Sequence, residues 1–274
     1  LITGFTYDGP EFGTNTNVHP TQIIWGGGGS LTINQEIGDL TLVSITAYRE
    51  GSITQTIDSD ATPTPIVDVI FEQNDKQFSQ ELQLQSSDSG PFTWVAGLYY
   101  LDTSGRYPYS TADIRIPPYT EPFLRANITA DQDTKSYAAF AQATYSIGAM
   151  TNFTAGIRYT EDKREIINTV QRTFAGAPPG AISTASGKTS FDKVTWRLAL
   201  EHRFSNELLA YASYNRGFKS GLFDPSTQPL SIIQPEVLDA YEAGVKADLL
   251  DRNLRINLAG FHYDYSNLQV PRLV

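Results

Sequence analysis

The side chains best suited to chemistry in this sequence are a few scattered carboxylates and histidines. Glu201, Asp239 and Glu242 are the carboxylates that would pair for glycoside hydrolysis, but they stand in separate stretches and nothing fixes the separation that this reaction requires. The 3 histidines have no recognisable nucleophile beside them of the kind that a Ser-His-Asp hydrolase uses. Cysteine is absent, which excludes disulfides, zinc-thiolate sites and cysteine nucleophiles. We therefore expect no enzyme, no metal site and no cofactor.

Binding sites for phosphate or nucleic acid are equally poorly supported. The segment 25–30 contains four consecutive glycines but no following lysine, so we predict a flexible connection there. Gly187-Lys188-Thr189 lacks the glycine that a phosphate-binding loop needs five residues earlier, because Ile182 stands at that position. The net charge is −10, from 20 basic and 30 acidic side chains, which argues against nucleic-acid binding.

A richer cluster lies in the segment 103–133, where aromatic and arginine side chains recur. Such residues combine large contact area with fixed positive charge, and loops often carry binding sites. We predict that this segment is a long loop that contacts a ligand; the alternative is an aromatic loop that packs on its neighbours or lies at a membrane interface. The candidate ligand-binding residues are Arg106, Tyr107, Tyr109, Arg115, Tyr119, Phe123 and Arg125.

The elements that must position these residues are β-strands, because apolar residues recur with period two. From Tyr137 to Ile147 the odd positions are tyrosine, alanine or isoleucine, whereas Gln142 stands among the polar even positions. No stretch approaches the run of about 18 apolar residues that a membrane helix needs. We predict strands at residues 31–37, 40–49, 77–86, 92–102, 137–147, 152–160, 193–201, 208–218, 237–249 and 254–265, with a β-bulge near Ala259.

The connections between these strands alternate between short and long. Tight turns at 38–39, 87–91, 148–150, 205–207 and 250–253 alternate with long segments at 50–76, 103–133, 164–191 and 219–236. Successive connections of an up-and-down antiparallel sheet lie at opposite ends, so one end carries the tight turns and the other the long loops. Outer-membrane barrels have this asymmetry. We predict an all-β, antiparallel, up-and-down transmembrane β-barrel; a soluble β-sandwich enzyme or lectin is the alternative.

Charged residues on the polar positions of these strands are predicted to face the barrel lumen, since a charge cannot face lipid cheaply. They either contact a ligand or an internal domain, or simply form the polar wall. The lumen-facing candidates are Arg158, Lys193, Arg197, Glu201, Glu242 and Lys246.

Several stretches resemble barrel strands of TonB-dependent outer-membrane receptors. They are FSQELQL at 78–84, WVAGLYY at 94–100, AGIRYT at 155–160, YASYNRGFKSG at 211–221, and PE at 235–236 followed by YEAGVK at 241–246. The resemblance implies a larger barrel of about 22 strands, filled by an N-terminal plug domain. It also implies uptake of a scarce nutrient such as a siderophore–iron complex across the Gram-negative outer membrane, with energy delivered through TonB.

Two departures from a complete receptor suggest a fragment of about ten strands. Nothing before Leu31 resembles a plug domain or a TonB box, and the C-terminal residues Arg272-Leu273-Val274 lack the terminal aromatic residue of the family. We expect residues 1–30 to be a loop or linker and residues 31–274 to be a partial receptor barrel without plug and C-terminal strands. The expected partners are membrane lipid, the plug and remaining strands of the parent chain, TonB through the absent N-terminal region, and a small external solute. A passive porin or adhesin barrel is the alternative.

Overall fold

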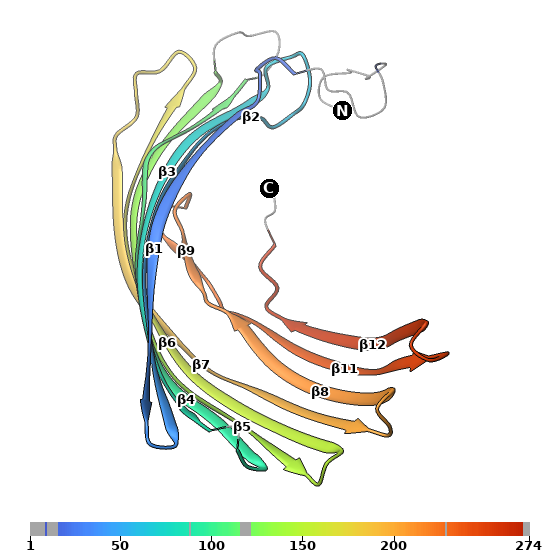
Figure 1. The fold of residues 1–274 in the computed structure, drawn as a ribbon. Helices are drawn as coiled ribbons and strands as arrows, with labels where there is room; N and C mark the ends of the chain where they lie inside the picture. Colours follow the sequence, from blue (N-terminus) through green and yellow to red (C-terminus); the bar gives the residue numbers. More distant parts are fainter. Residues whose placement is uncertain (1–8, 10–15, 88, 116–121, 228, 271–274) are drawn as a thin grey trace.

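The computed structural model describes residues 9, 16–87, 89–115, 122–227 and 229–270. These residues form an all-β structure of antiparallel strands, as predicted, curved into an open trough (Figure 1). None of the described residues forms a helix that is long and apolar enough to span a membrane. Tyr119 and the C-terminal residues 271–274 lie outside the described residues.

The main sheet contains ten strands, and each pairs with its neighbours in chain order except for one inserted hairpin. The strands of this sheet are β1 Thr21–Ile37, β2 Leu40–Asp58, β3 Val67–Ser86, β4 Phe92–Ile114, β5 Leu124–Ile147, β6 Thr151–Phe174, β7 Ser183–Arg203, β8 Leu208–Lys219, β11 Glu236–Leu249 and β12 Leu254–Ser266. The hairpin between β8 and β11 consists of β9 Leu222–Asp224 and β10 Ser231–Ile233 and forms a separate two-stranded sheet.

The strands extend much further than the sequence pattern predicted. Most of the segments 50–76, 103–133 and 164–191 is strand, so the connections shorten to residues 59–66, 115–123 and 175–182. The prediction of long loops was therefore wrong for these three segments. The physical reason is that alternation marks a strand only where one face is apolar. In the extensions the apolar face of the central strands does not continue. From Arg125 to Asp133 of β5 the odd positions are polar, and apolar residues occupy the even positions 124, 126, 128 and 130 instead.

The four-glycine segment belongs to a strand, so the predicted loop over residues 1–30 is wrong for residues 21–30. Strand β1 pairs without interruption with β2, from Thr21 with Thr56 to Ile37 with Leu40. A Cβ atom at Gly28 would lie 2.5 Å from the carbonyl oxygen of Tyr48. Glycine therefore permits a close approach of the two backbones here.

The predicted β-bulge near Ala259 is absent from the described residues. Strands β11 and β12 pair in one unbroken register, from Val237 with Ser266 to Leu249 with Leu254. The register shifts lie instead between residues 72 and 74 of β3 and between residues 107 and 110 of β4. The change of apolar phase along β12 therefore means that its apolar side chains move from one face of the sheet to the other without a backbone irregularity.

The concave face of the sheet is identified by the β9–β10 hairpin, which lies on that side (Figure 1). Phe223 of β9 packs against Ala130 of β5 and Ile166 of β6 in the small buried core. Since side chains alternate along a strand, the even positions of β5 and β6 face the concave side and the odd positions face the convex side. The convex face then carries the row of tyrosine and alanine residues from Tyr137 to Tyr145.

Candidate functional site

The candidate site is the concave wall, and the strand register brings the six predicted lumen residues onto it. Lys193 pairs with Thr160, two residues along the same face from Arg158. Arg197 pairs with Asn215, and Glu201 with Tyr211. The neighbouring strand β11 continues the face, because Glu242 pairs with Ser213 and Lys246 with Leu209. The structure thus places Arg158, Lys193, Arg197, Glu201, Glu242 and Lys246 on one continuous surface.

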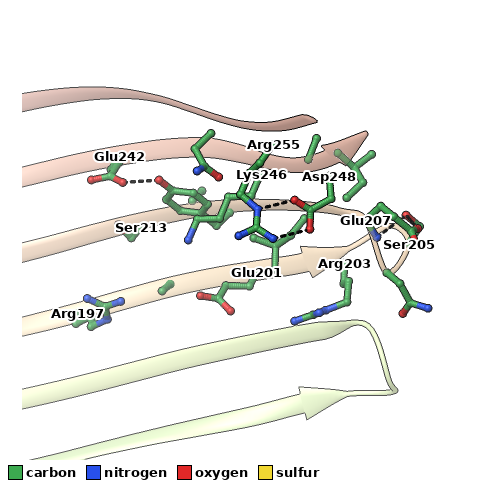
Figure 2. A pocket seen from close by; sticks show the side chains of 18 of the residues that line it. Arg197, Glu201, Arg203, Ser205, Glu207, Ser213, Glu242, Lys246, Asp248 and Arg255 are labelled. Atoms are coloured by element: carbon green, nitrogen blue, oxygen red, sulfur yellow. Dashed lines mark hydrogen bonds and ion pairs between the residues drawn. The ribbon is translucent and has the colours of Figure 1, made fainter. Parts of the chain in front are cut away.

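Charged side chains gather in a hollow of about 760 Å³ near the tight turns of β7, β8, β11 and β12 (Figure 2). Its lining includes four basic and four acidic side chains, so its net charge is near zero. They are Arg197, Arg203, Lys246, Arg255, Glu201, Glu207, Glu242 and Asp248. The turn between β7 and β8 contributes Glu207, whose carboxylate accepts a hydrogen bond from the Ser205 hydroxyl.

Only part of this charge is neutralised within the hollow. The guanidinium of Arg255 donates two hydrogen bonds to the Asp248 carboxylate, with N–O distances of 2.6 and 3.0 Å. The Tyr211 hydroxyl donates to Glu242 over 2.6 Å, and the Lys246 ammonium lies 5.6 Å from the centre of the Tyr211 ring.

The remaining charged groups are available to a partner. Among the described residues, the side chains of Glu201 and Arg203 have no ion-pair or hydrogen-bond partner, and Arg197 has a single hydrogen bond of 3.4 Å to Asn215. Unpaired charges of both signs on one wall are suited to hydrogen bonds and ion pairs with a polar body in the lumen. The hollow is therefore suited to noncovalent recognition of a polar partner.

The predicted ligand-binding segment is divided between the two faces. Arg106 is on the convex face of β4, where its guanidinium lies 2.9 Å from a carboxylate oxygen of Asp133. Its neighbour Tyr107 is on the concave face and packs against the buried core beneath the hairpin. The backbone of Tyr109 in β4 pairs with Glu72 of β3. The exposed ring of Phe123 packs edge-on against the Phe174 ring, with 6.3 Å between the ring centres.

Arg115 and Arg125 belong to an ion-pair network at the rim of the convex face. Asp68 and Asp113 are cross-strand neighbours, and Arg115 reaches both, with N–O distances of 2.5 and 3.1 Å. Arg125 adds a two-pronged interaction with Asp113 at 2.7 and 2.8 Å. These two arginines link β3, β4 and β5 at the rim. Their partners lie on neighbouring strands, so this structural role could not be predicted from the sequence. Of the candidates in β4 and β5 whose side chains are described, only Tyr107 lies on the concave face.

The connection 59–66 at the same rim is organised by one carboxylate. Asp60 accepts hydrogen bonds from the backbone amides of Thr62, Ile66 and Val67 and from the Thr62 hydroxyl. Partial burial opposes ionisation, but these hydrogen bonds outweigh it and lower the pKa of Asp60.

We expect this connection to loosen at low pH. Because the pKa of Asp60 is lower in the folded state than its ordinary value of 3.8, the ionised carboxylate stabilises the loop above that value. This stabilisation is lost as the pH falls through the folded-state pKa. Hydrogen exchange, corrected for intrinsic rates, should show falling protection of the Thr62, Ile66 and Val67 amides. In D60N the protection should be low at all pH values, whereas D39N, at an exposed turn, should match the wild type.

The convex face carries a row of aromatic side chains that the sequence analysis did not identify as a unit. Tyr100 and Tyr137 lie 5.3 Å apart between ring centres, and Tyr214 and Tyr241 stack at 4.7 Å. Polar groups border the row: the Tyr214 hydroxyl donates to Asp239, which also pairs with Arg216 at 2.9 Å. Aromatic belts of this kind mark the boundary between hydrocarbon and water on membrane barrels. The row consists of Tyr48, Phe78, Tyr100, Tyr137, Tyr159, Trp196, Tyr214 and Tyr241.

Three solved structures with a similar fold are described as uptake, import or siderophore receptors. The ferric yersiniabactin uptake receptor FyuA from Yersinia pestis matches with a TM-score of 0.75 and 19% identity, over 92% of this chain and 37% of its own. The ferric-catecholate import receptor Fiu from E. coli K12 matches with a TM-score of 0.64 and 14% identity, over 97% of this chain and 44% of its own. The siderophore receptor PiuA from Acinetobacter baumannii matches with a TM-score of 0.60 and 17% identity, over 88% of this chain and 40% of its own.

This chain therefore spans less than half the length of these three structural relatives. At such low identities the likeness establishes the fold: an antiparallel barrel wall. The family assignment comes from the sequence itself, since the model of the TonB dependent receptor-like β-barrel matches residues 2–274. The chain belongs to the TonB-dependent receptor β-barrel family.

Proposed function

We propose that this chain is part of the barrel wall of an outer-membrane TonB-dependent receptor that takes up a scarce nutrient. The observation that carries the proposal is the opposite character of the two faces. Large apolar side chains stand on the convex face, where Ile157 is 58% exposed and Leu258 is 71% exposed. Water would make this surface costly, whereas lipid accepts it. The concave face instead carries the unpaired charges.

The full barrel, with about 22 strands, would complete the cylinder that these ten strands begin. A plug domain in its lumen is the polar body that Arg197, Glu201 and Arg203 would contact. Tyr107 lies on the same concave wall, nearer the connection 115–123, and is our candidate for contact with the solute. A siderophore–iron complex is the favoured solute, because FyuA, Fiu and PiuA are described as receptors for such compounds.

The test is uptake of radioactive iron, supplied as a panel of ferric siderophores, by iron-starved cells. We expect deletion of the parent gene to abolish uptake of at least one ferric siderophore. Loss of TonB should have the same effect. Uptake that depends on the receptor but continues without TonB would indicate a passive porin. Normal uptake of every siderophore, together with weaker cell attachment, would indicate an adhesin.

The same proposal predicts which end of the barrel faces outside. Connections 59–66, 115–123, 175–182 and the segment 220–235 all leave one end of the sheet, and the tight turns leave the other. We expect an epitope tag inserted at 175–182 in the full-length receptor to bind antibody on intact cells. A tag in the turn at 205–207 should bind only after the outer membrane is opened. The reverse pattern would contradict this orientation.

A further inference from the structure

We infer that the β9–β10 hairpin is a gate, held against the lumen wall by Phe223, that covers part of the surface offered to the solute. The inference rests on the proposed function and adds a regulatory contact to it. The hairpin lies on the concave side of the sheet, in the space that the completed barrel would enclose (Figure 1).

The contact is built around one aromatic ring. Phe223 is only 3% exposed and packs with Ala130 and Ile166, which are each 2% exposed. A Cβ atom at Gly187 of β7 would lie 2.9 Å from the Phe223 ring, so the missing side chain of this glycine makes room for the ring. The Phe223 ring therefore fits the space above Gly187 on the wall, as expected for a specific docking position.

Polar contacts hold the tip of the hairpin in the same position. The side-chain amide of Asn168, a residue that is 1% exposed, donates to the carbonyl oxygen of Pro225 over 2.7 Å. The Arg172 guanidinium donates to the carbonyl oxygen of Ser226 over 3.3 Å. At the base of the hairpin a Cβ atom at Gly221 would lie 2.5 Å from the Phe191 ring. The docked state is therefore specific at its base, its ring and its tip.

The hairpin can leave this position without damage to the barrel. Its strands have three residues each and pair with one another, not with the ten-stranded sheet. A two-stranded hairpin has little stability of its own, so its position depends on the wall contacts. Release would expose Ala130, Ile166 and the side chain of Tyr107 on the concave face. Tyr107 is the residue that we propose contacts the solute. The docked hairpin therefore competes with the solute for this part of the wall.

Thiol labelling of the full-length receptor on intact cells tests the gate directly, because residues 1–274 contain no cysteine. In a background without other accessible cysteines, A130C should react slowly with fluorescein maleimide, since the docked hairpin covers it. Adding F223S should speed labelling by about tenfold or more, because release exposes the site. The matched control is I232S, which removes an apolar side chain from the same hairpin at a position that is 44% exposed. I232S should leave the rate unchanged.

A disulfide between I166C and F223C provides the second measurement. Oxidation should lock the hairpin and stop uptake of the ferric siderophore that the wild-type receptor takes up, and a reductant should restore it. Equal labelling of A130C with and without F223S, or full uptake by the locked receptor, would overturn the gate. If the wild-type receptor takes up no siderophore, the proposed function fails, and the labelling rates alone decide whether the hairpin docks as a gate.

Discussion

Residues 1–274, expressed alone and refolded in detergent, are expected to yield no heat-modifiable, protease-resistant monomer. In the described structure β1 and β12 are the two free edges of the sheet, and they are 17 and 13 residues long. Each edge presents unpaired N–H and C=O groups, and each such group costs several kcal/mol in hydrocarbon. The open sheet should therefore aggregate through its edges.

Closure of these ten strands on themselves is the competing outcome. A smaller cylinder requires stronger curvature and would force the charged side chains of the concave wall into a narrow interior. The full-length receptor, refolded by the same protocol, is the positive control and should show heat-dependent mobility. A stable closed monomer from residues 1–274 would refute the requirement for further strands and favour a small independent barrel.

An arginine on the convex face at mid-height should destabilise the barrel by about 2–4 kcal/mol, as measured for lipid-facing arginine near the bilayer centre. Ala141 is a suitable position because it is exposed on the convex face, between Tyr137 and Tyr145. A141R would place a guanidinium in hydrocarbon without a partner. Urea unfolding of the full-length receptor in lipid vesicles should show this loss of stability.

The neighbouring residue supplies a matched control for this substitution. Gln142 is exposed on the same strand, but its side chain points to the concave face, beside Gly156. Q142R introduces the same charge one residue away and should change the stability by no more than about 0.5 kcal/mol, as exposed substitutions usually do. Equal losses for A141R and Q142R would contradict the assignment of the two faces.

The sequence alone was sufficient to predict the fold class and to predict which side chains of the central strands share a face. Alternation in stretches such as 137–147 requires one apolar and one polar face, because a slip of one residue would exchange them. The same alternation led to the six charged residues that share the concave face. The family resemblance also rested on local stretches of strand, and the match to residues 2–274 shows the family.

The tertiary structure decided what local pattern could not express. The strand extensions do not continue the apolar face of the central strands, so the alternation is interrupted or changes phase there and these segments were predicted as loops. Their pairing is visible only from the neighbouring strands. Because residues 103–114 belong to β4, the side chains of Arg106 and Tyr107 point to opposite faces of the sheet. The pairing of β4 with β5 also brings Arg115 and Arg125 into ion pairs with Asp113. The docking of Phe223 beside Gly187 joins residues of two elements and requires the curvature of the sheet. Such contacts depend on distances between strands, which spacing along the chain does not determine.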